Sequence, residues 1–235
     1  STLRDLSAPE LRRAQILLFH KWDNTRKFLD GVDLEAGKLL TSGRQMKGHN
    51  PLTRDTAYVL ENYLAAFDEP GEWFLDDRST LHYVPLPGET PDKSTVVAPV
   101  AERLIEIAGD PATGKFVEHL TFRGLAFQHT SWHTPPQGFE PMQAAALIEA
   151  AVQIDGARHV TFDDCEIGHV ATYGLWFRKG CRDGLVTHCD LHDLGAGGIR
   201  IGETGIAAKD DERTSHITID NNFIRHGGRI FPCAV

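Results

Sequence analysis

Titratable side chains recur at matching positions in the second half of the sequence. The segments that align are HLTFRGLAFQH (119–129), HVTFDDCEIGH (159–169), GLVTHCDLHD (184–193) and HITIDNNFIRH (216–226). Their last residues form one column, made of His129, His169, Asp193 and His226. A carboxylate placed between imidazoles can orient them and perturb their pKa values, so this column is a candidate for acid–base chemistry.

Two other interpretations of this column remain open. Turn histidines are often hydrogen-bonded structural residues, and His169, Asp193 and His226 could also bind a metal ion. We expect no metal, because the repeat sets the spacing of these side chains and ligand geometry does not.

Asp193 also begins the glycine-rich stretch DLGAGGIRIGE (193–203), which ends at Glu203. Its glycines at positions 195, 197, 198 and 202 either turn a tight corner or let a ligand approach the backbone. Arg200 and Glu203 could form an exposed ion pair or belong to a site.

Gln153, Trp176 and Arg200 align in the repeat and alternate with apolar neighbours, so they are expected to point outward. Aromatic rings near carboxylates suit sugars, whose apolar faces stack on them. The alternative is that Trp132 and Trp176 pack beneath a loop. The candidate substrate-binding residues are Trp132, His169, Trp176, His192, Arg200 and His226.

The elements that would position these residues are short strands. Inward columns recur as Leu120/Val160/Gly184/Ile217, Phe122/Phe162/Val186/Ile219, Leu125/Cys165/Cys189/Asn222 and Phe127/Ile167/Leu191/Ile224. A third strand follows in AVQI (151–154), GLWF (174–177) and GIRI (198–201). Three strands in about 24 residues predict an all-β fold with a right-handed parallel β-helix. PMQAAALIEAAV (141–152) is the one helix-like patch, although it overlaps a strand position.

The N-terminal part has a different pattern. Apolar and aromatic runs broken by Asp-Gly, Ala-Gly, Ser-Gly and Pro-Gly turns predict a smaller β-rich, sandwich-like module over residues 1–92. The β-helix is predicted over residues 93–235, after a linker at LPGETPDKST (86–95). TRDTAYVLENYLAAFD (53–68) is compatible with a short helix or a further strand.

Composition excludes some partners. The net charge of −9 over 235 residues argues against nucleic acid and against an anionic membrane surface. No apolar run is long enough for membrane insertion. The four cysteines contain no CxxC pair, so a zinc knuckle is not expected. Cys165 and Cys189 are predicted to be buried thiols rather than a disulfide.

Several stretches resemble a family of bacterial parallel β-helix proteins that includes glycoside hydrolase family 141, with α-L-fucosidase and xylanase members. They are HKWDNTR (20–26), ENYLAAFDEPGEWFLDDRSTLHYVPLPGE (61–89), LTFRGLAFQHTSW (120–132), YGLWF (173–177) and DLGAGGIRIGE (193–203). The resemblance runs from about residue 13 to the end, and GEWFLDDRSTLHYVPLPGE is its most specific part.

This resemblance implies a glycoside hydrolase that acts on plant or bacterial polysaccharide or oligosaccharide and needs no cofactor. The acidic pair that it implies falls on Asp193 and Glu203, one as proton donor and one as nucleophile or base. Such a substrate implies a periplasmic or extracellular protein. Family members continue with further coils, so the resemblance also implies a chain truncated at its C-terminal end, at Val235.

Two other functions stay open at this point. A polysaccharide lyase would need a basic residue beside a cation site, for which Arg200 and Arg225 are the candidates. A non-catalytic carbohydrate-binding β-helix module, or an inactive fragment, would need neither the acidic pair of a hydrolase nor the base and cation site of a lyase.

Overall fold

The computed structural model describes residues 3, 6–44, 46–76 and 78–234. Val235, where the repeat was expected to break off, lies outside the described residues. The chain divides into two compact units, Ser1–Val96 with Thr134–Glu140, and Val97–His133 with Pro141–Val235. A segment inserted in the second half therefore belongs to the N-terminal unit. Among the described residues, no helix has the length and apolar character to cross a membrane.

The N-terminal unit is an antiparallel β module. After α1 (Ala8–Arg13), a four-stranded sheet has the order β3-β2-β1-β4. Its strands are β1 (Gln15–Phe19), β2 (Asn24–Asp33), β3 (Lys38–Thr41) and β4 (Tyr58–Glu61). A 3-10 turn, η2 (Leu64–Ala66), leads to a separate hairpin of β5 (Trp73–Leu75) and β6 (Leu81–Tyr83). The core of the sheet contains Leu11, Ala14, Ile16, Leu18 and Leu29.

The inserted segment Thr134–Glu140 is held within this unit by backbone and charge. Arg26 and Phe139 exchange N–H···O bonds of 2.9 and 2.7 Å. The buried Lys27 ammonium contacts the Glu140 carboxylate at 2.8 Å and donates to the carbonyl of Arg44 at 2.6 Å. A buried charge needs such partners, so this segment is part of the fold of the module.

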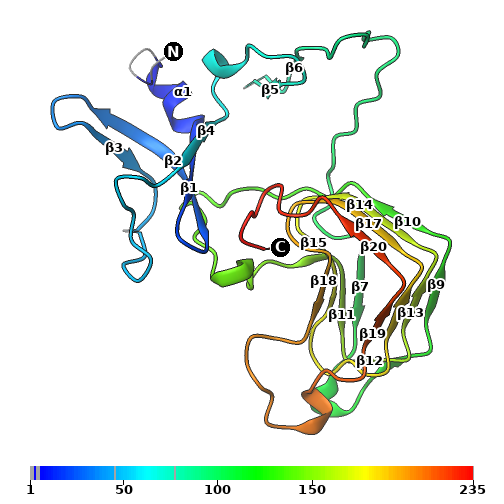
Figure 1. Cartoon of the computed structure of the whole chain (residues 1–235). Helices are drawn as coiled ribbons and strands as arrows, with labels where there is room; N and C mark the ends of the chain where they lie inside the picture. Colours follow the sequence, from blue (N-terminus) through cyan, green and yellow to red (C-terminus); the bar gives the residue numbers. More distant parts are fainter. Residues whose placement is uncertain (1–2, 4–5, 45, 77, 235) are drawn as a thin grey trace. The chain divides into compact units, whose positions relative to one another are not determined.

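The second unit is a stack of coils with three sides, and each side is a parallel β-sheet (Figure 1). The first side contains β9 (Thr121–Arg123), β13 (Thr161–Asp163), β16 (Leu185–Thr187) and β19 (Thr218–Asp220). The second side contains β10 (Ala126–Gln128), β14 (Glu166–Val170), β17 (Asp190–Leu194) and β20 (Phe223–Arg225). The third side contains β7 (Ile105–Ala108), β11 (Ala150–Asp155), β15 (Tyr173–Phe177) and β18 (Ile199–Ile201).

Shorter elements complete this unit. The two-residue strands β8 (Val117–Glu118) and β12 (Ala157–Arg158) pair with each other. The 3-10 turns are η3 (Pro111–Thr113), η4 (Gln143–Ala145) and η5 (Asp210–Glu212). The helix-like patch at 141–152 therefore folds as η4 and the start of β11, because Ala150 and Val152 pair with β15 and bury their side chains in the coil.

Strand register confirms the predicted inward columns and the all-β fold class. Phe122, Phe162, Val186 and Ile219 are successive partners on the first side. Phe127, Ile167, Leu191 and Ile224 are successive partners on the second. Phe162 is fully buried, and its ring stacks on Phe122 with centroids 4.8 Å apart. Cys165 and Cys189 are free buried thiols, as predicted.

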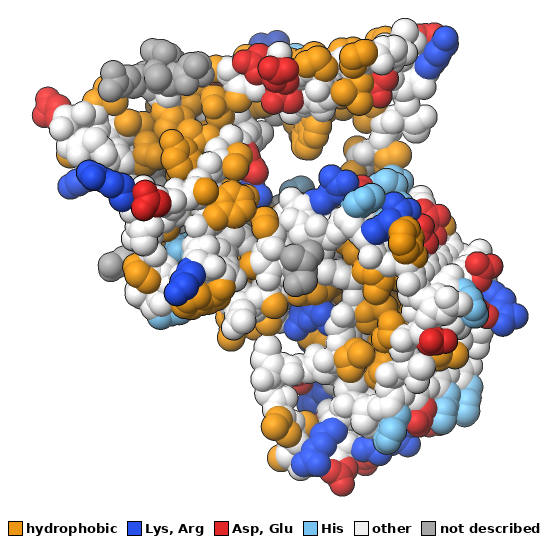
Figure 2. Space-filling view, in the orientation of Figure 1, with side chains coloured by type: hydrophobic (Ala, Val, Ile, Leu, Met, Phe, Trp, Pro, Cys, Tyr) orange, Lys and Arg blue, Asp and Glu red, His pale blue; other side chains and the backbone are white. Residues whose placement is uncertain are grey.

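A residue with a positive φ stands at every corner of the repeat, and Gly156 and Gly180 add a second one after the third side. Between the second and third sides these are His129, His169, Asp193 and His226. Between the first and second they are Gly124, Asp164, His188 and Asn221, and after the third they are His119, His159, Asp183 and His216. Asp, Asn and His are the non-glycine residues enriched in this left-handed region. The repeated histidines, which form groups along the edges of this unit (Figure 2), therefore have a backbone cause.

The glycine-rich stretch is mainly a packing feature. A Cβ at Gly195 would overlap the carbonyl oxygen of Ala171 on the neighbouring coil. A Cβ at Gly197 would lie 2.6 Å from the carbonyl oxygen of Ala234, and one at Gly198 would lie 2.6 Å from the Ile224 side chain. The contacts of these three glycines therefore support the interpretation that they turn a tight corner, rather than the one in which they let a ligand approach the backbone.

Gly195→Ala is expected to lower the free energy of unfolding by about 3 kcal/mol, because the clash is with backbone. That corresponds to a fall in Tm of roughly 6–12 °C for a chain of this size. Gly205→Ala is the matched control, since its Cβ would enter open space, and it should change stability by less than about 0.5 kcal/mol. Equal melting temperatures for the two variants would contradict this assignment.

Candidate functional site

The third side of the β-helix lies between the two longest interruptions of the coils. Residues 129–149 separate β10 from β11, and residues 202–217 separate β18 from β19. Elsewhere the corner between the second and third sides is short, as in the step from Val170 to Tyr173. Long loops beside a rigid sheet are where sites occur most often, so outward residues of the third side are the first to consider.

Two outward columns cross the third side. Glu106, Gln153, Trp176 and Arg200 are successive partners on β7, β11, β15 and β18. The prediction that Gln153, Trp176 and Arg200 share a column is confirmed, and Glu106 joins them. In the next outward column, Asp155 ends β11 and Arg178 follows β15.

Trp176 and Arg200 contact each other closely. The Arg200 guanidinium carbon lies 3.7 Å from the Trp176 ring centroid, and the indole Nε1 donates to the carbonyl of Gly202 at 2.8 Å. Arg200 also donates to the carbonyls of Ile148 and Ala146 at 3.0 and 2.8 Å, and its burial lowers its pKa. Because Trp176 is only 6% exposed, it is not the open stacking platform that the sequence suggested.

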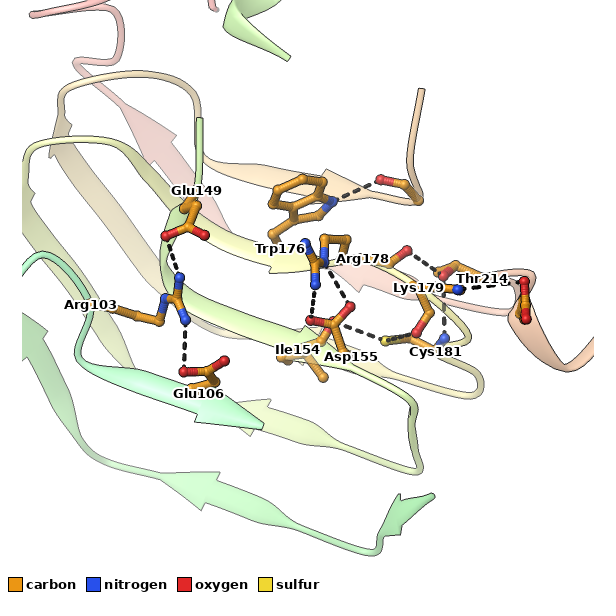
Figure 3. Close-up of polar contacts among 12 residues, drawn as sticks. Arg103, Glu106, Glu149, Ile154, Asp155, Trp176, Arg178, Lys179, Cys181 and Thr214 are labelled. Carbon is orange, nitrogen blue, oxygen red and sulfur yellow. Dashed lines mark hydrogen bonds and ion pairs between the residues drawn. The ribbon is translucent and has the colours of Figure 1, made fainter. Parts of the chain in front are cut away.

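Arg178 contacts the carboxylate of Asp155 (Figure 3). It donates to both oxygens of Asp155, at 2.7 and 2.8 Å. This hydrogen bonding raises the pKa of Arg178, although burial lowers it, and the charges of Asp155, Glu203 and Glu149 raise it further. We call Asp155, Arg178, Glu203 and Glu149 the Arg178 cluster. Three carboxylates thus act on one guanidinium.

A pocket of about 240 Å³ adjoins this cluster. Its lining comes from the end of the third side and from the following loop: Arg178, Gly202, Glu203, Gly205, Ile206, Ala207, Glu212, Arg213 and Thr214. Glu203 is exposed here, while the Asp155 side chain is only 14% exposed. The acidic residues of the lining are Glu203 and Glu212, and Asp155 is joined to the pocket through Arg178.

A second ion-pair group borders the same face. Arg103 bridges Glu106, at 2.7 Å, and Glu149 (Figure 3). Gln153, which is next to Glu106 in its column, is 2% exposed. Its Oε1 has no hydrogen-bond partner among the described residues, which leaves one acceptor unused at the centre of this side.

The histidine column and its neighbours form a different group, on the second side. His169 Nδ1 lies 2.6 Å from Asp193 Oδ2, and Arg229 pairs with the other oxygen of Asp193. His192 Nε2 lies 2.9 Å from Glu166 Oε1, which also accepts from Gln128 at 2.6 Å. These contacts join neighbouring coils and are partly exposed to solvent.

The structure does not bring Asp193 and Glu203 together. Asp193 lies at the corner before the third side and Glu203 follows its end, with β18 between them. The three residues of β18 alone cover about 10 Å, so the predicted pair is split between two places. His226 is exposed at the same corner as Asp193. Trp132 packs edge-on against the buried Phe231, with ring centroids 4.8 Å apart, in agreement with the packing alternative.

Sequence reasoning missed Asp155, Arg178, Glu106 and Glu149. Strand alternation could have found the first two, because Asp155 is two residues after Gln153 and Arg178 two after Trp176. Among the described residues, no group of three or more His, Cys, Asp or Glu side chains could hold a metal ion.

Comparison with known proteins supports the fold. A family model described as a right-handed beta helix region matches residues 150–234. This part of the chain is a right-handed parallel β-helix. A solved structure described as a glycoside hydrolase is similar over 95% of this chain, with a TM-score of 0.80 and 22% sequence identity. The present chain spans 46% of that protein. No curated protein matches the sequence.

The Glu166–His192 contact predicts a pH-dependent stability. The hydrogen bond from His192 is the main cause that lowers the pKa of Glu166 below its ordinary value of 4.5. A lowered pKa stabilises the fold above 4.5, and this contribution is lost as the pH falls through the folded-state pKa. At pH 7, Glu166→Gln should lower Tm by about 2 °C, since partly exposed pairs contribute little.

The difference in Tm between Glu166→Gln and the unsubstituted protein should shrink as the pH falls below 4.5. Glu102→Gln, at an exposed glutamate of the same unit, is the control and should give no such trend. A Tm difference that stays constant between neutral and acidic pH would contradict the assigned role of this contact.

Proposed function

We propose that this chain carries part or all of the active site of a glycoside hydrolase, on the third side of its β-helix. The observation that carries the proposal is the bidentate contact between Asp155 and Arg178, next to a pocket that Arg178 and Glu203 both line. Glycosidic bond cleavage needs two carboxyl groups in different environments. The fold similarity to a glycoside hydrolase supports the choice of this chemistry.

Asp155 is the proposed base. Its two oxygens accept hydrogen bonds from Arg178, in a bidentate geometry that fixes the orientation of the carboxylate. Arg178 is thus a positioning residue that holds the base in one orientation.

Glu203 is the proposed proton donor. It is exposed at the pocket, so it can reach the oxygen of a leaving group. This keeps one of the two acidic residues implied by the sequence resemblance and replaces Asp193 by Asp155 as its partner.

The spacing of the coils favours inversion of the sugar. Asp155 belongs to the coil of β11, Arg178 to the coil of β15, and Glu203 follows the coil of β18. Two coil spacings separate the backbones of the two acidic residues by about 10 Å. Asp155 contacts Arg178, and Glu203 lines the same pocket as Arg178. Carboxyl groups in inverting enzymes are about 6.5–9.5 Å apart, which leaves room for a water molecule, whereas retaining pairs are about 5 Å apart.

Elimination by a lyase is the second candidate, because burial lowers the pKa of Arg200 and so favours the neutral form that a base requires. Two observations favour hydrolysis over elimination. Arg200 already donates to two backbone carbonyls and covers Trp176, and the pKa of Arg178 is raised. Products distinguish the two reactions, since only a lyase forms an unsaturated sugar.

Asp155→Asn and Glu203→Gln should each lower kcat on aryl glycosides or on xylan and pectic oligosaccharides by about 10²–10⁴-fold. The reason is that each removes one of the two groups that transfer protons. The measurement is the initial rate over such a substrate panel for this chain and for a longer chain that contains it. Asp193→Asn should keep the rate of the unsubstituted protein.

Asp163→Asn is the matched control for Asp155→Asn. Asp163 also accepts from an arginine of the neighbouring coil, with Arg123 Nε at 2.8 Å, but it lies on the first side. It should leave kcat within about twofold, as other distant surface changes do. Activity lost in Asp193→Asn but kept in Asp155→Asn would return the catalytic role to the second side. Binding of sugar without turnover in either chain would favour a non-catalytic module.

The first sugar released should have the inverted anomeric configuration, because the acidic residues are two coils apart. Proton NMR of the products, recorded before mutarotation, measures this directly. Retained configuration would show that a closer pair of carboxyl groups does the chemistry.

A further inference from the structure

The N-terminal unit contains a pocket of its own, of about 350 Å³. It lies among β4, η2 and β5, and its lining is Val59, Leu60, Glu61, Asn62, Tyr63, Ala66, Phe67, Gly71, Glu72, Trp73 and Phe74. This volume is within the range of about 300–1,000 Å³ for small-ligand sites. All of these residues belong to the same compact unit.

Aromatic rings form much of the wall of this pocket. Phe74 is buried, Tyr63 and Phe67 are half-buried, and Trp73 is 67% exposed. Trp73 pairs across the hairpin with the exposed Tyr83. A tryptophan this exposed beside a concave site offers a flat apolar surface to a ligand.

Acceptor oxygens lie among these rings. Glu61 uses Oε2 to pair with Arg26, and Glu72 uses Oε2 to accept from the N–H groups of Asp68 and Glu69. Those two backbone bonds lower the pKa of Glu72, so this carboxylate is charged. Asn62 donates its amide to the carbonyl of Arg13 at 3.2 Å. In the described parts of the chain, no group donates a hydrogen bond to Glu61 Oε1, Glu72 Oε1 or Asn62 Oδ1.

We propose that this pocket binds one sugar residue of a neutral glycan, as a subsite separate from the third side of the β-helix. A pyranose ring has apolar faces that stack on aromatic rings and hydroxyl groups that donate to carboxylates and amides. The pocket supplies both kinds of contact. This inference rests on the proposed function for its ligand class.

Charge selects a neutral sugar over an acidic one. Glu61 and Glu72 line the pocket, and no Lys or Arg is part of its lining. The chain as a whole carries a net charge of −9. Arg26 offsets the charge of Glu61, so Glu72 is the group that would repel a uronate carboxylate, whereas the hydroxyl groups of a neutral sugar would be bound.

Trp73→Ala should weaken the binding of soluble xylo-oligosaccharides by at least about tenfold, because the stacking surface is lost. The dissociation constant is measured by calorimetry on the whole chain, and oligogalacturonides serve as the acidic probe. Trp22→Ala is the matched control, since Trp22 is 46% exposed in the same unit but is not part of the lining. Glu61→Gln is a second variant that keeps the shape of the pocket.

The expected result is weak binding by Trp73→Ala, unchanged binding by Trp22→Ala, and no binding of oligogalacturonides. Hydrolysis of a small aryl glycoside, which occupies only the third side, should be the same in all variants. Binding by Trp73→Ala within twofold of the unsubstituted protein, or equal binding of oligogalacturonides, would overturn the subsite. Absence of hydrolysis together with Trp73-dependent binding would overturn the proposed function and leave the subsite standing.

Discussion

The parallel register between neighbouring coils is the constraint on which the second unit depends. Backbone hydrogen bonds fix each coil about 4.8 Å from the next, so a residue type that recurs in the sequence forms a column in space. The interior columns give the core, with Phe162 stacked on Phe122. The outward columns give cross-coil ion pairs on all three sides, at Arg123–Asp163, Glu166–His192 and Asp155–Arg178.

Much of the fold of this unit could be predicted, since strand alternation and repeat spacing are both visible in the sequence. The third-side column of Gln153, Trp176 and Arg200 follows directly from that alternation. The candidate site could be predicted less well. Whether Trp176 is open to a ligand depends on Arg200, which lies over its ring while bonding to Ala146 and Ile148 of a long loop. The alternation of apolar and polar residues along a strand contains no information on such a contact with a loop.

The histidine column shows why a recurring titratable residue is an ambiguous sign of function. His159 and His216 recur after the third side in the same backbone conformation as His169 and His226 at the other corner. A preference for positive φ explains both sets, and only the contacts distinguish them. Asp155 is the opposite case, because it belongs to no repeated motif, yet both oxygens of its carboxylate accept from an arginine on the third side.

The corners between the first and second sides also limit how such a protein can vary over evolutionary time. Each of them is two residues long in every described coil, with one left-handed residue and no insertion. The interruptions at residues 129–149 and 202–217 lie where extra length is tolerated, and both border the third side. Relatives could therefore exchange their specificity by changing these two loops alone, while the scaffold beneath them keeps the same perimeter.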